Sequence, residues 1–333
     1  MPRPPRVTGR DVADRAGVSR ATVSYVLNDT AGQPISADTR ARVLAAATEL
    51  GYTPHAAARQ LRTGVSDVVL LALPPFPMSH AFSVCVSRFT HRLGELGYTA
   101  LVDHATQEVA RLEQTLARVQ PVAMVASGEF LSESLVARLR AAGTRAVLGF
   151  GEGPLGFVPA VVFDQSAITR VAMAHLASRG HRTVLAVMPP EPEFQWFRAG
   201  RQAGAQASAE LHDMVLTVVD SPLDQDRVAT AVTTALSGSE RPDAVLAYND
   251  DYALLAIRAL LDAGFDVPGD VAVIGCDNLA VAELFTPRLT TVHVDMEALG
   301  TRIADALHDI LCTGEEPEVI PAPTPVVVVR DSA

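Results

Sequence analysis

The chain has 333 residues, of which 48% are hydrophobic and 20% are charged, and its formal net charge is −11. A chain of this length exceeds one compact core, so we expect two or three domains in a water-soluble globular protein. No apolar run approaches the roughly 20 residues that span a membrane, and residues 1–6 lack the apolar core of a signal peptide. These features predict a cytoplasmic protein with no membrane partner.

The three cysteines, Cys85, Cys276 and Cys312, are far apart and lack metal-ligand spacing, so we expect neither a disulfide framework nor a metal site. Residues 1–64 contain nine arginines and five acidic residues, whereas the rest of the chain carries 18 basic and 33 acidic residues. A small basic region on a large acidic body is expected when only that region contacts phosphates. The chain has no lysine, which excludes P-loop and Schiff-base lysine chemistry. We predict no cofactor.

Residues 8–28 predict two short helices that meet at Gly17. Thr8 can cap the first helix and Ser19 the second. The apolar positions of these helices are Val12, Ala13, Ala16, Val23, Val26 and Leu27. The second helix then presents a mostly polar strip, Arg20, Ala21, Ser24, Tyr25 and Asn28. Such a strip is what a helix-turn-helix inserts into the DNA major groove, although an ordinary pair of packed helices has the same apolar spacing.

Ser36 can cap a third helix over residues 37–50, which stops at Gly51. We expect this helix to present Val43, Leu44, Ala47 and Leu50 to the first two helices. Residues 52–64 follow, with Pro54 and Gly64 bracketing one or two helical turns that are too short to be stable alone. This segment is either a flexible linker or a helix that forms only against a partner.

The amino-acid sequence of the first two predicted helices resembles the N-terminal signature of the LacI/GalR family of transcriptional repressors. The matching residues read Asp11-Val12-Ala13-x-x-Ala16-Gly17-Val18-Ser19-x-x-Thr22-Val23-Ser24-x-Val26-Leu27-Asn28. The resemblance implies a sequence-specific DNA-binding regulator that binds a palindromic operator in double-stranded DNA as a homodimer. It also implies a hinge helix that pushes Leu61 into the minor groove. The DNA-binding residues expected are Thr8, Ser19, Arg20, Ala21, Thr22, Ser24, Tyr25, Asn28, His55, Ala58 and Leu61.

The sequence departs from the family pattern at two positions. Tyr25 stands where many members carry arginine, and His55 where many carry asparagine. A tyrosine can contact a phosphate or a thymine methyl group, but it cannot make the bidentate guanine contact of arginine. The operator sequence therefore cannot be carried over from other members.

From Asp67 onward, short apolar runs rich in valine and leucine alternate with amphipathic stretches of helical length. This alternation predicts an α/β body of two doubly wound parallel-sheet lobes with helices on both faces. The resemblance implies the same arrangement, the type I periplasmic-binding-protein-like fold, with three crossings between the lobes. The runs are 68–73, 98–102, 122–126, 145–149, 160–163, 183–188, 214–219, 243–247 and 271–275. The expected domains are a headpiece 1–52, a hinge 53–64, one lobe of 65–163 with 293–321, and another of 164–292 with 322–333.

Ligands of doubly wound sheets bind beyond the carboxyl ends of the strands. Aromatic rings, carboxylates and amides at those ends suit a sugar effector, because rings cover its apolar face and polar groups bind its hydroxyls. Tyr248-Asn249 and Asp277 also resemble family segments whose asparagine and aspartate bind effector hydroxyls. The candidate effector-binding residues are Phe76, His80, Phe82, Asp164, Trp196, Arg198, Arg201, Tyr248, Asn249 and Asp277.

Several of these assignments have alternatives. The family has an arginine three residues before a glycine, which fits Arg201 and Gly204 but leaves Arg198 as a second possibility. Trp196 can stack on a sugar or simply pack, and Asn249 can cap a helix. A solute-binding protein would account for the body but not for the basic head. A sugar-processing enzyme would need a base or nucleophile that the sequence does not offer, so we predict no catalytic residues. No heptad-bearing tail follows Arg330, which favours a dimer over a tetramer.

Overall fold

The computed structural model of the chain describes residues 7–27, 33–52, 66–73, 78–104 and 109–333. It divides into two compact units, Met1–Asp67 and Val68–Ala333, which are described separately below. Among the helices of the described residues, none is long and apolar enough to cross a bilayer.

The described residues of the first unit form three helices, α1 (Gly9–Ala16), α2 (Arg20–Leu27) and α3 (Ala37–Glu49). The N-terminus of α1 is capped at Thr8. The Asp11 carboxylate accepts hydrogen bonds from the backbone N–H and the hydroxyl of Thr8, both at 2.7 Å. Gly17 ends α1 at φ 68°, a left-handed conformation that suits glycine. Ser19 Oγ then accepts a hydrogen bond from the N–H of Thr22 at 3.1 Å, which caps α2. The local signals for two capped helices are confirmed.

A small apolar core holds the three helices together, and Arg15 of α1 pairs with Glu49 of α3 at 2.6 Å on its surface. Leu44, which we expected in this core, is 47% exposed instead. It lies roughly 100° around α3 from Val43, because an α-helix has 3.6 residues per turn. Ala46 is buried in its place. The buried core residues are Val12, Ala13, Ala16, Val23, Val26, Val43, Ala46 and Ala47.

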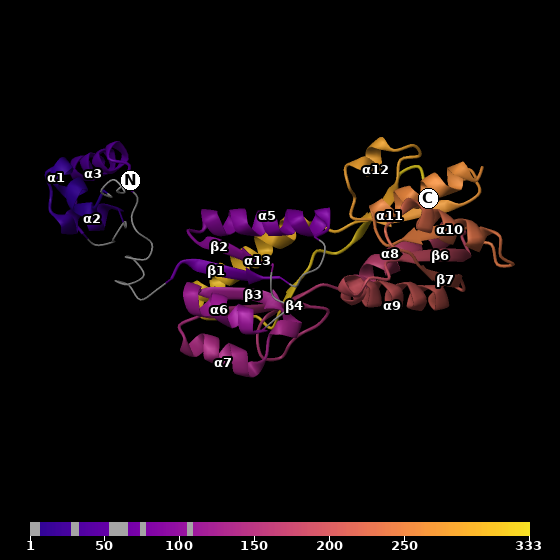
Figure 1. The fold of residues 1–333 in the computed structure, drawn as a ribbon, viewed down its shortest axis with the longest axis horizontal. Helices are drawn as coiled ribbons and strands as arrows, with labels where there is room; N and C mark the ends of the chain where they lie inside the picture. The colour runs from indigo at the N-terminus through magenta and orange to yellow at the C-terminus, as the bar shows by residue number, and fades with distance from the viewer. Residues whose placement is uncertain (1–6, 28–32, 53–65, 74–77, 105–108) are drawn as a thin grey trace, which may run out of the picture. The chain divides into compact units, whose positions relative to one another are not determined.

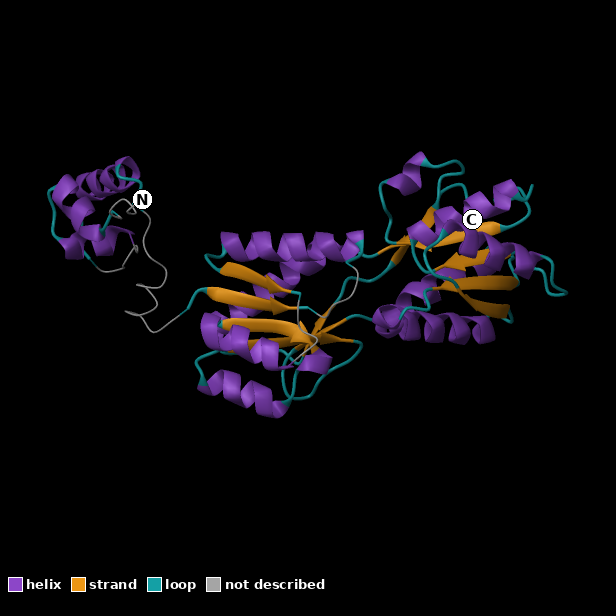
Figure 2. Ribbon diagram, viewed as in Figure 1, coloured by secondary structure: helices purple, strands orange, loops and turns teal. Residues whose placement is uncertain are grey.

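The second unit contains two six-stranded sheets (Figures 1 and 2), and each predicted apolar run overlaps one of their strands. The first sheet has the order β11-β5-β4-β3-β1-β2, and all its strand pairs are parallel. Its strands are β1 (Val68–Ala72), β2 (Thr99–Asp103), β3 (Ala123–Ser127), β4 (Ala146–Gly151), β5 (Ala160–Val162) and β11 (Val319–Pro321). Its helices are α5 (His80–Glu95), α6 (Val109–Val119), α7 (Glu133–Ala141) and α13 (Met296–Thr313).

Both faces of the first sheet are buried, as continuous apolar strands predict. Val69 and Leu71 of β1 pack with α5 and α13 on one face, while Leu70 and Ala72 pack with α6 and α7 on the other. Figure 1 shows α5 on one side of this sheet and α6 and α7 on the opposite side. The alternation follows from the two-residue period of a β-strand.

The second sheet has the order β12-β10-β9-β8-β6-β7. Its edge strand β12 runs antiparallel to β10, which differs from the purely parallel sheet that we expected, whereas the remaining pairs are parallel. Its strands are β6 (Thr183–Met188), β7 (Val215–Asp220), β8 (Ala244–Ala247), β9 (Ala272–Cys276), β10 (Thr290–His293) and β12 (Val326–Val328). Its helices are α8 (Gln165–Ser178), α9 (Gln195–Leu211), α10 (Gln225–Leu236), α11 (Asp250–Asp262) and the short α12 (Val281–Leu284).

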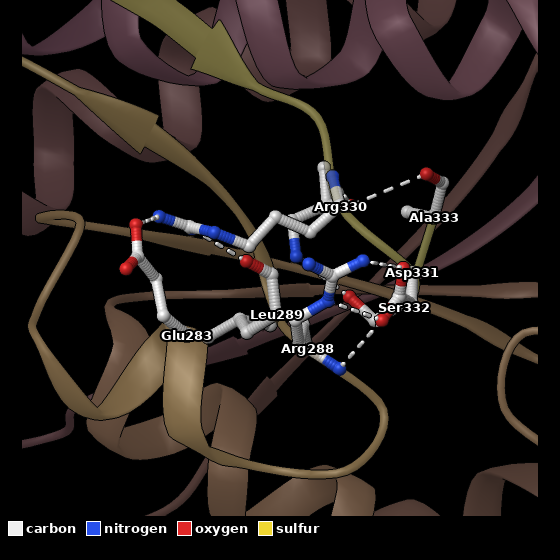
Figure 3. A network of polar contacts seen from close by, with 8 residues as sticks. Glu283, Arg288, Leu289, Arg330, Asp331, Ser332 and Ala333 are labelled. Atoms are coloured by element: carbon white, nitrogen blue, oxygen red, sulfur yellow. Dashed lines mark hydrogen bonds and ion pairs between the residues drawn. The ribbon is translucent and has the colours of Figure 1, made fainter.

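The chain passes between the two sheets three times, from β5 to α8, from β10 to α13, and from β11 to β12. The last passage ends in a polar network that fastens residues 330–333 to the second sheet (Figure 3). Arg330 donates to the backbone oxygen of Leu289 at 2.8 Å, and Ser332 Oγ donates to that of Val273 at 2.6 Å. Arg288 also pairs with Asp331 at 2.7 Å.

Candidate functional site

The described part of the first unit presents one face of α2 without core contacts. Ser19, Arg20 and Ala21 are exposed, Thr22, Ser24 and Tyr25 are partly buried, and Val23 and Val26 on the opposite face are buried. Thr8 is exposed at the start of α1. The polar strip therefore starts at the N-terminal end of a short helix and runs along the face opposite its buried valines, as on a reading helix that contacts base edges and phosphates. Four residues of the predicted DNA-binding set, Asn28, His55, Ala58 and Leu61, lie outside the described residues.

The second unit contains a cavity of about 460 Å³, lined by residues that follow strands of both sheets. Phe163 comes after β5, Glu191 after β6, Tyr248 and Asn249 after β8, and Asp277 after β9. This is the position that the strand-end rule predicts for a ligand site. The lining residues are Met78, Ser79, Ala81, Phe82, Phe163, Gln165, Ile168, Glu191, Glu193, Phe194, Phe197, Arg201, Leu223, Tyr248, Asn249, Asp251, Tyr252, Asp277, Val294 and Met296.

Arg201 of α9 is the buried cation of this cavity, with 7% of its surface exposed. Its Nε donates to Gln165 Oε1 at 3.0 Å, its Nη1 donates to the backbone oxygen of Tyr248, and its guanidinium lies 4.4 Å from the centre of the Tyr248 ring. Burial lowers the pKa of Arg201, but neighbouring acidic groups, among them Asp277 and Asp250, raise it further than burial lowers it. The side chain is therefore a fixed, permanently charged group.

The position of α9 against α8 sets the depth of Arg201. Thr169 Oγ1 of α8 donates to the backbone oxygen of Arg201 at 2.7 Å. A Cβ atom at Gly204 would collide with the backbone oxygen of Ser166 and with Thr169 Oγ1, so only glycine allows this approach. The Arg201–Gly204 spacing that the sequence singled out thus has a packing reason.

Asp277 follows β9 at φ 102°, and its N–H donates to the backbone oxygen of Val292 at 2.9 Å. Burial raises the pKa of the Asp277 carboxyl, while the charge of Arg201 lowers it. The fully buried Asp250 holds the loop that follows, because its carboxylate accepts hydrogen bonds from the N–H of Leu279 at 2.7 Å and from the Thr291 hydroxyl. Asp277 is thereby fixed at the rim of the second sheet.

Asn249 and Tyr248 reach the cavity from the turn between β8 and α11. The side-chain oxygen of Asn249 accepts a hydrogen bond from the N–H of Tyr252 at 3.2 Å, so this residue also caps α11, as the sequence indicated. The Tyr252 hydroxyl donates to the backbone oxygen of Ser221 at 3.0 Å. The aromatic wall of the cavity is consequently fixed by hydrogen bonds as well as by packing.

The structure brings together five of the predicted effector-binding residues in the cavity lining: Phe82, Arg201, Tyr248, Asn249 and Asp277. Four others lie outside that lining. Arg198 pairs with Asp220 at 2.6 Å, and Asp164 caps α8 and pairs with Arg170 at 2.7 Å, so these charges are used in local contacts. Trp196 packs edge-on against Phe197, with ring centres 4.5 Å apart, and His80 begins α5. Phe76 lies outside the described residues.

Sequence reasoning missed several lining residues, above all Gln165, Glu191, Glu193 and Asp251. Gln165 directly follows Asp164, which was selected at the end of this predicted strand instead. Glu191 and Glu193 follow β6 within the run Pro189-Pro190-Glu191-Pro192-Glu193-Phe194. The strand-end rule, applied to this strand as it was to β8 and β9, would have found them.

Each of the two units matches a known protein family. Residues 8–55 match the lacI family of bacterial regulatory proteins, and residues 173–333 match a periplasmic binding protein-like domain. The HTH-type transcriptional repressor PurR of Escherichia coli O1:K1 is 32% identical over 324 residues, covering 94% of this chain and 93% of the relative.

Two solved structures are also similar over nearly the whole chain. The lac repressor dimer bound to operator and the anti-inducer ONPF superposes with a TM-score of 0.79 at 25% identity, covering 98% of this chain and 99% of that one. The transcriptional regulator CelR–cellobiose complex gives a TM-score of 0.65 at 26% identity, covering 98% and 100%.

A helix-turn-helix unit joined to a two-lobed binding domain with an internal cavity defines a DNA-binding transcriptional regulator controlled by a small-molecule effector. The chain belongs to the LacI family of bacterial regulatory proteins.

Proposed function

We propose that this protein is a homodimeric repressor that binds a palindromic operator and responds to a sugar-sized effector in the cavity lined by Arg201, Asn249 and Asp277. The cavity is the main observation that supports this proposal. It combines fixed polar groups with aromatic walls, the combination that holds the hydroxyls and the apolar face of a sugar ring. The relatives named above support it, since one was solved with operator and an anti-inducer and another with cellobiose.

On the DNA side, the proposal assigns contacts to the exposed face of α2 and to Thr8. A homodimer places two copies of this helix about a two-fold axis, which is why an inverted repeat is the expected site. We also propose that residues 53–64 are a hinge. The boundaries between the lobes then lie near residues 163, 293 and 322. The hinge would couple the angle between the lobes to the headpieces.

The experiment is a thermal-shift screen of the protein against sugars and nucleosides, followed by operator binding with and without each stabilising compound. We expect at least one compound both to raise the melting temperature and to change operator affinity. A compound that stabilises the protein without any effect on DNA binding would contradict effector control.

We further propose that the protein acts by binding alone and that it works in the cytoplasm. The known relatives are transcriptional regulators, which supports the absence of catalysis. Incubation of stabilising sugars with the protein, followed by mass spectrometry, is expected to return each sugar unchanged.

A further inference from the structure

The charges that line the cavity are unbalanced. Among its described residues the lining has four carboxylates, those of Glu191, Glu193, Asp251 and Asp277, and one guanidinium, that of Arg201. A site for an acid or a phosphate ester needs an excess of cationic groups, because an anion that leaves water must be paired. The excess in this cavity has the opposite sign.

The guanidinium of Arg201 is already engaged by the protein. Gln165 and the backbone of Tyr248 accept its hydrogen bonds, and the Tyr248 ring covers one of its faces. Its charge acts on Asp277, whose pKa it lowers against the effect of burial, and also on its neighbours Tyr248 and Cys276. No comparable cation pairs with Glu191 or Glu193 in the contacts of the described residues.

The carboxylates act unfavourably on one another and on their neighbours. Burial raises the pKa of Asp277, and the charge of Asp251 adds to that rise. Burial likewise raises the pKa of the Tyr252 hydroxyl, and the charge of Glu191 raises it further. A positive charge within the cavity would lower the pKa of both Asp277 and Tyr252, since an opposite charge favours the ionised form of an acidic group.

One oxygen of this set is buried without a partner. Oε2 of Glu191 has no hydrogen-bond partner among the described residues. A buried carboxylate oxygen without a donor is costly, and a donor that carries a positive charge compensates it best. Glu191 is therefore the carboxylate with most to gain from a ligand N–H group.

Aromatic rings complete the site. Among the described residues six rings line the cavity, those of Phe82, Phe163, Phe194, Phe197, Tyr248 and Tyr252. Ring faces attract organic cations through their electron density and also pack against the apolar part of the same ligand. Carboxylates beside aromatic faces form the usual recognition surface for an amine.

We propose that the effector is a small organic cation whose protonated amine is bound by Glu191, Glu193 and Asp251 while its ring packs on the aromatic side chains. This inference rests on the proposed function, and it means that a sugar effector is an amino sugar.

The test uses calorimetric titration of the full chain with three probes of similar shape and different charge: benzylamine, benzyl alcohol and benzoate. At neutral pH we expect the protonated amine to bind at least about tenfold more tightly than the alcohol, and benzoate not to bind. The preference should decrease as salt is added. Equal or tighter binding of the alcohol or of benzoate overturns the proposal, and so does the absence of benzylamine binding.

Two variants locate the charge that is recognised. Glu191→Gln and Asp251→Asn should each reduce the preference for benzylamine over benzyl alcohol several-fold, and Asp251 is exposed, so its variant should fold even where Glu191→Gln does not. Glu240→Gln is the matched control, because Glu240 is an exposed carboxylate of the same unit that does not line the cavity. An unchanged preference in both variants, or an equal loss in the control, overturns the proposal.

Operator binding separates this inference from the proposed function. If the amine preference is found but no bound compound changes operator affinity, the proposed function fails and the charge assignment stands. If neutral sugars change operator affinity and the three probes show no charge preference, the charge assignment fails and the proposed function stands.

Discussion

Asp277 lies at φ 102°, a backbone conformation in which asparagine and aspartate are tolerated better than most residues. The substitution Asp277→Asn therefore removes the charge with little change in local backbone preference. We expect it to weaken the binding of a stabilising effector by about ten- to a hundredfold, since hydrogen bonds to charged groups contribute roughly 1.5–3 kcal/mol. Operator affinity of the ligand-free protein should remain close to that of the wild type.

The measurement is calorimetric titration of both proteins with the same effector, with circular dichroism as a check of folding. A folded Asp277→Asn variant with unchanged effector affinity would remove Asp277 from the binding site.

The buried Asp250 carboxyl should make the stability of the protein depend on pH. Burial raises the pKa of this carboxyl to about 7, against the effect of hydrogen bonds from Thr291 and Leu279, and the charge of Asp277 adds to the rise. In the unfolded chain an aspartate titrates near roughly 3.9. Between these two values the native state holds the proton more tightly, so the free energy of unfolding falls as the pH rises from about 4 to about 7 and then levels off.

Asp250→Asn cannot titrate, so we expect its stability to fall less than that of the wild type over this range. Urea unfolding at about pH 5 and about pH 8 measures the difference. Parallel pH profiles of the two proteins would contradict a buried Asp250 carboxyl with a raised pKa.

Arg198 and Arg201 show the limit of residue-level reasoning from sequence. The family spacing fits Arg201 with Gly204, whereas Gly200 as the reference leaves Arg198 beside the expected position, and both arginines lie on α9 about one turn apart. What separates them is the approach of α8 at Gly204, which buries Arg201 beside Gln165, and the nearby Asp220, which pairs with Arg198. These contacts join residues far apart in the sequence, so the spacing alone could not choose between the two.

The close packing of α8 against α9 depends on Gly204. We expect Gly204→Ala to destabilise the protein by about 1–3 kcal/mol, the usual cost of overpacking, because the new Cβ atom would meet backbone and side-chain atoms of Ser166 and Thr169. Gly94→Ala is the control, since a Cβ there has nothing within 4 Å and lies within helix α5. It should be neutral or stabilising by about 0.5–1 kcal/mol.

Chemical unfolding of both variants measures this difference. A similar stability change in the two proteins would show that the α8–α9 approach is not tight, and effector affinity that falls only in Gly204→Ala would show that Arg201 moves with α9.

The elements themselves were largely predictable. Alternating apolar runs located nine of the strands, because strands buried on both faces leave an uninterrupted apolar signal. The direction of β12 was not predictable, since a run of valines reads alike in parallel and antiparallel pairing, and the polar network of Arg330, Asp331 and Ser332 that fixes its end is long-range. Leu44 was misplaced because five consecutive apolar residues of α3, residues 43–47, could face the core and only their packing decides which do.

Charge is divided between a basic first unit and an acidic second unit. By formal count, residues 1–64 carry +4 and the rest of the chain −15. We expect the isolated second unit not to bind operator, because its charge repels phosphates. Operator affinity of the full protein should fall by about 10³-fold or more between about 50 and 200 mM salt, if about six phosphates are neutralised.

Fluorescence anisotropy with labelled operator at several salt concentrations gives the slope directly. A flat dependence on salt, or tight operator binding by residues 68–333 alone, would contradict an interface confined to the headpiece.

Trp196 is the only tryptophan of the chain, and its ring packs edge-on against Phe197, which lines the cavity. Tryptophan fluorescence, excited at wavelengths too long for the five tyrosines to absorb, therefore originates from one position, next to a residue of the cavity lining. We expect ligand binding in the cavity to change the wavelength or the intensity of this fluorescence. The measurement needs no added dye and has no background from other side chains. The molecule thus contains its own optical reporter, and stopped-flow mixing can time ligand entry separately from release of the operator.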